Sequence, residues 1–544
     1  MNDLGPRSSR KDSKLYAFST TVEGAFDNDW LWDVYVSAGK TENDSLLSNR
    51  TNKLRLGDSA NFTNGENGLC GVDDMSCPAW NSLQPMSQEV IDYVTLSPYG
   101  QQIDSEQFMF AASVSGDLYE LPAGDLMFAF GIEGRRENIE VSIDDTWQDE
   151  TLTGSQKLPW NKGRNIYDAF IEIEAPLVSD VFLVDELILN LAARYSDYQY
   201  AGSNTTWKAA IDWAVTDEFR IRSTFAHAVR APQLVEMFGS TSIGFSSGLS
   251  DPCDQENITT LKADLKAQVI SNCQAFGVED PENFESATNL GNGSDTTTSG
   301  NPHLDVEEAD TFTFGFVIQP SFLENFALTV DYYDIDLTDA IENISAGSIL
   351  YECAESSNIS SSYTCPLVSR NATGNVSNIL VAPVNKGAFT RRGLDIETSY
   401  DTDLPIGQLS LKLYATHIIE LSTQSTAGEE RFDYSGVYGS PDWKGRLEAN
   451  YTLNELRVNW SIDYTQSALV GRDKDIEDYS VPETPSSTVS NVRISYDLND
   501  DTNLYIGARN VFDKKWTHHP STSGGRGAYN LMGRFLYAGF SYNF

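Results

Sequence analysis

The chain has 544 residues, with 37 Lys or Arg against 79 Asp or Glu, so its formal net charge is -42. This acidity excludes proteins that bind along a nucleic-acid backbone, because phosphates attract cationic surfaces. A membrane-spanning helix is excluded because no run approaches roughly 18 uncharged apolar residues, and Met1–Arg10 lacks the apolar core of a signal peptide.

Alternating segments of about ten residues recur from end to end, as in strands that separate two different environments. In one of them Leu187, Leu189 and Leu191 share a face, because successive strand side chains point to opposite sides. No Pro-rich linker divides the chain, which favours one large all-β unit. The clearest segments are Leu187–Ser196, Glu218–Ala228, Leu409–His417, Leu456–Thr465 and Asn503–Arg509.

The connections between these segments alternate between tight turns and long loops. The turns are rich in Gly, Pro, Asn and Asp: Asp27–Asp29, Leu121–Gly124, Thr216–Asp217, Pro320–Asn325, Leu404–Gly407, Asn454–Glu455 and Asn499–Thr502. The loops span Glu42–Ser105, Ile139–Lys162, Arg230–Asp305, Asp339–Arg391, Ser422–Ser440 and Gly471–Pro485. Outer-membrane barrels place short turns in the periplasm and long loops outside. The pattern therefore favours a transmembrane antiparallel β-barrel over a soluble sandwich.

The six cysteines fall within the long loops as three local pairs. Short-range pairing is typical of disulfides made in an oxidising compartment such as the periplasm. A zinc site would require closer CxxC spacing, which does not occur. Fifteen connectivities are open to six cysteines, and local pairing is the hypothesis. It joins Cys70 with Cys77, Cys253 with Cys273, and Cys353 with Cys365.

The final segment, Asn530–Phe544, has an apolar face that includes Leu536 and Phe540 and ends on an aromatic residue. Such a face suits lipid, with an aromatic girdle residue at the bilayer edge. The segment is therefore interpreted as the closing strand of an outer-membrane barrel.

Several motifs occur in a fixed order along the chain: Ala226–Gln233 with Glu236–Phe238, Asn301–Leu304 with Glu307–Thr311, Asp331–Ile335, Gly393–Glu397 and Asn510–Lys515. Together they resemble the TonB-dependent outer-membrane receptors of Gram-negative bacteria. The resemblance covers essentially the whole chain. It implies the C-terminal part of the β-barrel of such a receptor.

The resemblance also implies parts that this sequence does not show. Receptors of the family have an N-terminal plug inside a barrel of about 22 strands, preceded by a segment that engages TonB. Counting back from Phe544 gives roughly 17 strands, beginning near Lys14. We therefore expect residues 1–544 to form one partial barrel domain without a plug. The plug and about five strands are expected upstream.

Aromatic residues in or beside the long loops are the candidate ligand-binding side chains. Flat rings there can stack on sugars, ring-bearing chelators or peptide side chains. The alternative is that they form the outer aromatic girdle and pack the loops. The candidates are Trp80, Tyr99, Trp147, Trp160, Tyr351, Tyr363, Tyr434, Tyr438 and Trp516.

Two arginines, Arg220 and Arg222, lie on the polar face of a predicted strand near its periplasmic end. We predict that they face the lumen, where they either pair with acidic residues of a plug or are simply solvated. The motif from Arg230 to Phe238, at the other end of this strand, is expected to fix loop geometry.

No catalytic residue, metal site or cofactor is predicted. Gly244–Gly248 has the G-x-S-x-G pattern of a hydrolase, but that motif needs a strand before it and a helix after it. His518–His519 and the acidic side chains Asp473, Asp475 and Asp478 are interpreted as solvated loop residues, since the aspartates lack the Gly and terminal Glu of an EF-hand.

The resemblance implies a ligand-gated, TonB-energised receptor that imports a scarce nutrient. Its expected partners are outer-membrane lipid, a small ligand, and the TonB system through the region upstream. The cargoes considered are glycan oligomers, peptides, ferric siderophores, haem and cobalamin, with a mild preference for a neutral glycan or peptide because Arg and Lys are not clustered. Two alternatives remain, a passive porin and a secreted β-rich adhesin or glycan-binding protein.

Overall fold

The computed structural model describes residues 2–60, 77–148, 156–424, 431–470, 481–515 and 532–543. One sheet of 18 strands dominates it. The two-residue strand β18 (Phe432–Asp433) only extends the end of β17, and the other 17 strands pair antiparallel, each with the next strand of the sheet. The predicted all-β class and strand number are therefore confirmed.

The 17 strands follow one another around the sheet in chain order. They are β1 (Ser8–Ala25), β2 (Leu31–Ser48), β3 (Tyr99–Leu121), β4 (Gly124–Ile143), β6 (Trp160–Val181), β7 (Val184–Tyr198), β8 (Gly202–Thr216), β9 (Phe219–Arg230), β12 (Glu307–Ile318), β13 (Phe326–Asn343), β16 (Pro383–Asp403), β17 (Gln408–Gln424), β19 (Trp443–Leu453), β20 (Leu456–Thr465), β23 (Ser487–Asn499), β24 (Thr502–Arg509) and β25 (Phe535–Tyr542).

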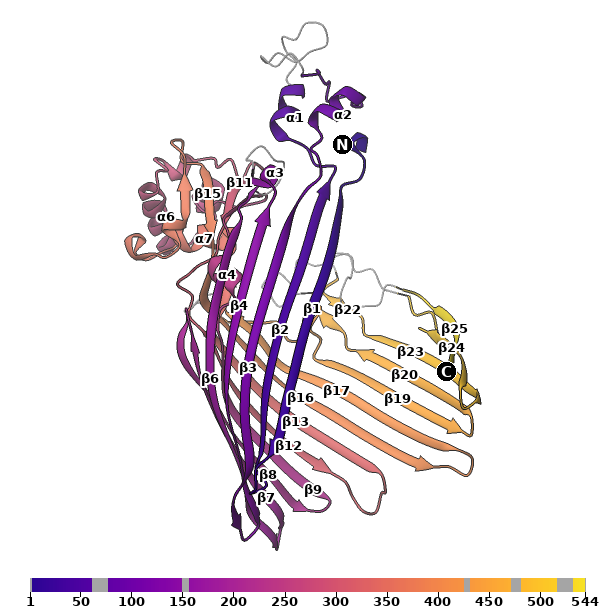
Figure 1. The fold of residues 1–544 in the computed structure, drawn as a ribbon. Helices are drawn as coiled ribbons and strands as arrows, with labels where there is room; N and C mark the ends of the chain where they lie inside the picture. The colour runs from indigo at the N-terminus through magenta and orange to yellow at the C-terminus, as the bar shows by residue number, and fades with distance from the viewer. Residues whose placement is uncertain are drawn as a thin grey trace.

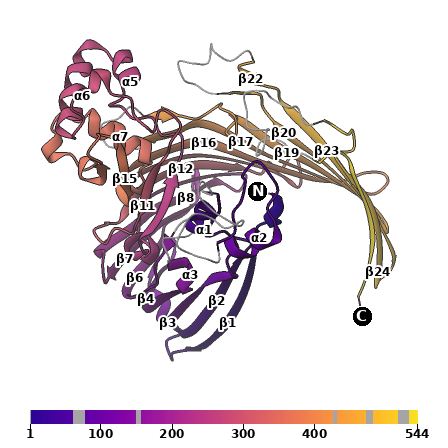
Figure 2. The same ribbon diagram turned by 90° about the horizontal axis from the view of Figure 1, so that it is seen from above.

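The sheet curves into an open wall. Seen from above, it runs as an arc from β1 round to β24, and the two ends of the arc lie apart (Figure 2). Within the described residues, β1 pairs only with β2 and β25 only with β24. The concave side of this wall is called the lumenal face below, and the convex side the outer face.

The seven predicted turns all lie between paired strands on one side of the sheet. An eighth turn joins β6 to β7 at Phe182 and Leu183, and the sequence did not indicate it because both residues are apolar. Leu183 adopts a φ of 63°, and Phe182 is 90% exposed. On the opposite side the connections are longer, except between β7 and β8, where three residues suffice.

The early strands extend well beyond the predicted segments. A strand needs about 9–11 residues to cross a bilayer, whereas β3 has 23 residues and β6 has 22. Figure 1 shows these long strands rising above the rest of the wall, with the helices α1 (Lys53–Ala60) and α2 (Gln88–Val94) above β1 and β2. The predicted loop Glu42–Ser105 is correspondingly shorter, because β2 and β3 stay paired up to Leu47 and Tyr99. Side chains at these ends pack against loop residues, as Tyr99 does against Trp147, so alternation between lipid and lumen no longer marks the strand.

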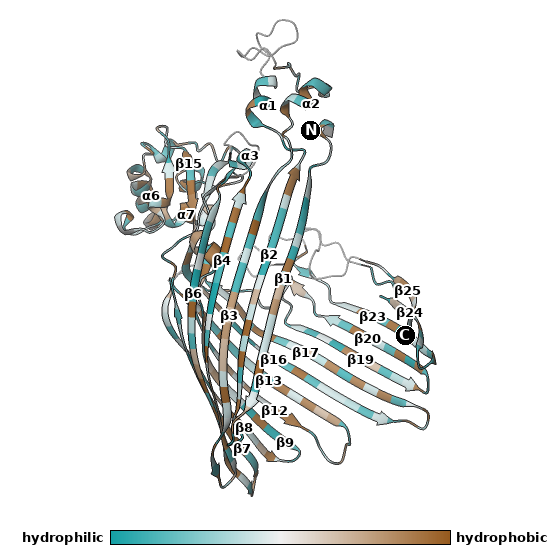
Figure 3. Ribbon diagram, viewed as in Figure 1, coloured by the Kyte–Doolittle hydropathy of each residue, from teal (hydrophilic) through white to brown (hydrophobic). Residues whose placement is uncertain are grey.

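The two faces of the wall differ in polarity. On the outer face Leu191 of β7 pairs with Ile173 of β6, whereas Ala192, the next residue, lies on the lumenal face opposite Glu172. Figure 3 shows apolar and polar residues alternating along the strands. No helix in the described part of the chain has the length and apolar character needed to cross a membrane.

The buried core lies in the loops. Residues 231–306 and 344–382 fold together as a unit that we call the apical subdomain, visible beside the tops of β4 and β6 in Figure 1. Its sheet has the order β14-β15-β11-β10-β5, and the parallel pair β11–β15 joins the two loops. Ser345 caps helix α7 by accepting a hydrogen bond from Ser348 N (3.0 Å). Ile349, Leu350 and Ile379 fill the core with almost no exposed surface.

The remaining elements are short. The helices are α3 (Asp145–Gln148), α4 (Leu234–Phe238), α5 (Gln255–Thr260), α6 (Ala263–Ala275), α7 (Ala346–Ala354), and the 3-10 turns η1 (Asn2–Leu4), η2 (Pro281–Asn283), η3 (Ile359–Ser361) and η4 (Cys365–Leu367). The strands are β5 (Gln156–Lys157), β10 (Ser242–Ser246), β11 (Ser294–Thr298), β14 (Val368–Arg370), β15 (Val376–Val381), β21 (Ala468–Leu469) and β22 (Glu483–Thr484).

The assignment of the two faces is testable with neighbouring substitutions on β7. Leu191→Arg places a cation against lipid. It is expected to lower the free energy of unfolding, and so destabilise the protein, by about 2–4 kcal/mol. Ala192→Arg places the same cation beside Glu172 on the lumenal face and is expected to cost less than about 1 kcal/mol. Urea titration of the protein in lipid vesicles, read by heat-modifiable migration on gels, measures both. Equal losses would contradict the assignment.

Candidate functional site

Ion pairs between side chains of different strands lie along the lumenal face. The Arg194 guanidinium on β7 lies 2.9 Å from Glu133 on β4 and 3.0 Å from Asp168 on β6. Asp168 is buried and also accepts a hydrogen bond from Ser196. Arg164 donates to Glu137 at 2.7 Å. Arg194 and Arg164 are thus neutralised by carboxylates of the wall itself.

The two predicted lumenal arginines both lie on this face. Arg220 approaches Asp212 at 3.0 Å and Glu186 at 3.5 Å. Arg222 forms two hydrogen bonds with Asp331, of 2.9 and 2.6 Å. The wall thus satisfies both guanidinium groups with its own carboxylates. Their pairing with a plug remains a prediction.

A hollow of about 610 Å³ opens on the lumenal face of β6 to β9. Phe170, Arg194 and Lys208 contribute an aromatic ring and two cations to it, and Glu172 contributes a carboxylate. Lys208 Nζ lies 3.4 Å from Glu172, which also accepts a 3.0 Å hydrogen bond from Asn190. The hollow can therefore contact a polar or aromatic group. Of these four residues only Arg194 lies in a predicted strand segment, and none was a predicted site residue.

The motif at the end of β9 fixes the entry to the apical subdomain. Arg230 pairs with Glu307 of β12 and with Glu236 of α4, the latter at 3.1 Å. Glu236 in turn accepts a 2.6 Å hydrogen bond from Gln233 N. Arg164 of the wall donates to the Pro232 carbonyl at 2.6 Å. These contacts have the geometric role that was expected of the motif.

The apical subdomain contains a buried ion pair. Arg370 and Asp251 are joined at 2.7 Å, with side chains only 6% and 0% exposed. Asp251 also accepts hydrogen bonds from Cys253 N (3.0 Å) and from the Ser286 hydroxyl (2.9 Å). The carboxylate therefore links three segments of the subdomain.

Two of the predicted disulfides are present, Cys253–Cys273 and Cys353–Cys365. The first lies in the cluster formed around Ile258, and the second joins α7 to η4. Cys77 is buried, but Cys70 lies outside the described residues, so the third pair remains a prediction.

The predicted tryptophans pack against loop residues. Trp147 is 9% exposed and contacts Tyr99 edge-on, with ring centroids 5.5 Å apart. The Lys157 ammonium lies 4.5 Å from the Trp147 ring, and burial lowers the pKa of this lysine. Trp160 packs against the same cluster, and Trp80 packs against the α2 side chains while donating to the Gln84 carbonyl at 3.0 Å.

Tyr99 is buried, whereas the other predicted tyrosines are more accessible. Tyr363 is 44% exposed, lies 5.0 Å from Lys386 Nζ, and has a pKa raised by partial burial. Tyr434 is exposed beside the Phe432 ring, Tyr351 shares a hydrogen bond with Ser250, and Tyr438 is half-buried. These rings belong to separate elements. Their role in ligand binding stays a prediction. Trp516 lies outside the described residues.

The G-x-S-x-G sequence does not form a nucleophile elbow. Gly244 and Ser246 lie in β10, which pairs antiparallel with β11, and Ser246 accepts a 2.7 Å hydrogen bond from Thr296. No helix follows directly. The pair His518–His519 and the acidic stretch around Asp473 lie outside the described residues. Elsewhere in the described chain, no group of three His, Cys, Asp or Glu side chains is arranged for a metal ion.

A protein-family model described as "TonB dependent receptor-like, beta-barrel" matches residues 2–511. No curated protein matches the sequence.

Solved structures with a similar fold include the siderophore receptor PirA from Acinetobacter baumannii, at 15% identity and a TM-score of 0.59, over 98% of this chain and 63% of that one. The ferric enterobactin receptor of Pseudomonas aeruginosa matches at 13% identity and 0.60, over 98% and 62%. The ferripyoverdine receptor of the same organism matches at 10% and 0.53, over 97% and 56%. The chain thus spans about three fifths of the length of the first two and less of the third.

The buried ion pair of the apical subdomain provides a test of how that unit is held together. Asp251→Asn removes the charge that compensates Arg370 and is expected to destabilise the subdomain by about 3–5 kcal/mol. Glu282→Gln in the exposed pair Lys266–Glu282 is the control, with an expected cost below about 1 kcal/mol. Hydrogen exchange of the subdomain amides measures both. Similar protection in the two variants would contradict the prediction.

Proposed function

Because the chain belongs to the TonB-dependent receptor β-barrel family, we propose that it forms the wall of a ligand-gated receptor that imports a scarce nutrient. Membership of this family places it in the outer membrane of a Gram-negative bacterium. Residues 1–544 act in this proposal as one partial barrel domain. In this proposal TonB supplies the energy through the plug and the N-terminal segment of the receptor.

The observation that carries the proposal is a folded, disulfide-linked apical subdomain attached to a wall with a polar lumenal face. The apical loops, including the exposed rings of Tyr363 and Tyr434, are the proposed ligand-contact surface. The lumenal face then provides the polar lining of the path that the ligand follows.

For the cargo, we favour a neutral glycan oligomer or a peptide. The lumenal cations described above are already paired with carboxylates of the wall, for example Arg194 with Glu133 and Arg222 with Asp331. A polyanionic cargo is recognised best by clustered cations that lack such partners. A ferric siderophore is the second candidate, because the structural relatives named above are siderophore receptors.

Transport rather than catalysis is proposed, since the family is one of receptors and the G-x-S-x-G sequence lacks the context that a nucleophile requires. A passive porin would share the wall but need no energy source. An adhesin would depend on the apical subdomain alone.

Uptake by whole cells distinguishes these functions. Cells with and without the gene are given radiolabelled oligosaccharides, peptides or ferric siderophores, each with and without a protonophore. We expect loss of the gene, or collapse of the proton gradient, to reduce uptake of one class to background, because TonB draws on that gradient. The wild-type gene on a plasmid is the control and restores uptake.

Other outcomes would contradict the proposal. Gene-dependent uptake that survives the protonophore identifies a porin. Unchanged uptake of every class, with loss of binding of the cells to a glycan surface, identifies an adhesin.

A further inference from the structure

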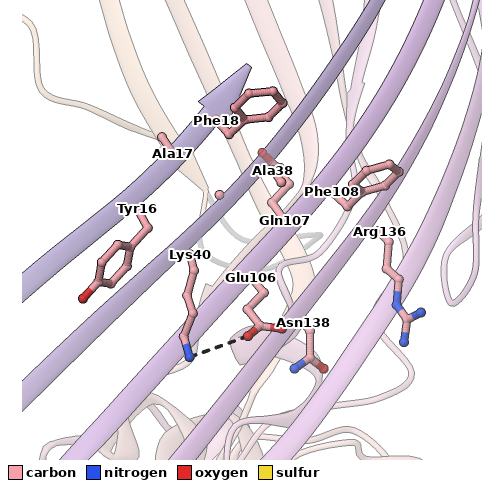
Figure 4. Close-up of a pocket in the computed structure, with 11 residues that line it drawn as sticks. Tyr16, Ala17, Phe18, Ala38, Lys40, Glu106, Gln107, Phe108, Arg136 and Asn138 are labelled. Carbon is pink, nitrogen blue, oxygen red and sulfur yellow. Dashed lines mark ion pairs between the residues drawn. The ribbon is translucent and has the colours of Figure 1, made fainter. Parts of the chain in front are cut away.

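A groove of about 650 Å³ lies across β1 to β4 on the outer face of the wall (Figure 4). Two rows of side chains line it, because residues directly opposite one another on paired strands share a face. The lower row is Phe18, Ala38, Phe108 and Arg136, and the upper row is Tyr16, Lys40, Glu106 and Asn138.

The groove marks the upper limit of the apolar part of the outer face. The rows nearer the hairpin turns are mostly apolar, for example Val22, Val34, Ala112 and Ile132. The next row toward the loops is charged and contains Lys14, Glu42, Asp104 and Glu140. Aromatic residues favour such a boundary between lipid chains and head groups. Tyr16, Phe18 and Phe108 therefore place the groove at head-group level.

The two cations of the groove differ in their surroundings. Lys40 Nζ is shared by three carboxylates, Glu42 at 3.2 Å, Asp104 at 3.3 Å and Glu106 at 3.7 Å. Its charge is more than compensated, so Lys40 offers little to a further anion.

Arg136 has no such compensation. It is exposed and forms no ion pair within the part of the chain that the structure describes. Its cross-strand neighbours are Phe108 on β3 and Asn165 on β6, and neither carries a charge. The nearest acidic positions on the same face are Glu106, which is bound to Lys40, and Glu140, four residues further along β4. A guanidinium at this level is suited to a bidentate contact with a phosphate.

We propose that this groove binds a phosphate-bearing lipid of the outer leaflet. An acyl chain lies along Ala38 between the rings of Phe18 and Phe108, and the head-group phosphate accepts hydrogen bonds from Arg136. Asn138 and the Tyr16 hydroxyl are placed to contact the polar part of the same head group. The inference depends on the location of the wall in the outer membrane and is independent of the cargo and of TonB.

Lipid A is the probe, and the protein is purified in detergent from outer membranes of cells that carry the gene. Native mass spectrometry measures the bound fraction as lipid A is added. Arg136→Gln is expected to weaken binding about tenfold, which is the loss of one charge-assisted hydrogen-bonded contact. Lys262→Gln removes one cation from the apical subdomain and is expected to leave binding unchanged. Phe108→Ala tests the acyl contact and should also weaken binding.

Two further arms identify the source of the phosphate. Diacylglycerol, which has the acyl chains but no phosphate, should bind no better to the wild type than to Arg136→Gln. Inorganic phosphate should not displace lipid A, because it lacks the acyl chain. The proposal is overturned if Arg136→Gln binds lipid A as the wild type does, if Lys262→Gln weakens binding equally, or if inorganic phosphate competes. Heat-modifiable migration confirms that each variant is folded.

Discussion

The structure depends on one constraint, that backbone amide and carbonyl groups inside a bilayer must find partners in the protein itself. A meander of antiparallel strands meets it, because each strand between β1 and β25 pairs along its length with a neighbour on either side. The pairing fixes the register, and the register separates the side chains into two sets. Apolar side chains then face lipid, as Leu191 does, and polar side chains face the lumen, as Arg194 does.

This arrangement leaves the wall without a hydrophobic core of its own. Cross-strand ion pairs satisfy the lumenal polar groups, and Asp168, with Arg194 and Ser196 as partners, is a buried example. The largest buried apolar cluster in the described residues lies where the chain leaves the wall, around Ile349 and Ile379 in the apical subdomain. There the disulfides and the Arg370–Asp251 pair join the short helices and strands of the two loops.

Local alternation and turn chemistry were sufficient to predict the strands and the seven turns, and short cysteine spacing predicted two disulfides, because each depends on residues close in sequence. The ends of β2 and β3 were not predictable, since pairing continues there beyond the bilayer, where residues such as Tyr99 pack against a loop. Nor was the packing of Trp147 against Tyr99, which brings together residues that are distant in sequence. The lumenal hollow was not predicted for a related reason, because its residues Phe170 and Lys208 come from different strands.

The parallel pairing of β11 with β15 has a mechanical consequence. It joins the loop that follows β9 to the loop that follows β13, through partners such as Thr296 and Ile379. A force applied to either loop is therefore transmitted to the other. Strand β5, from the loop between β4 and β6, pairs with β10 at the edge of the same sheet. A displacement of the two loops is therefore one concerted motion that also strains the pairing of β5, and not two independent motions.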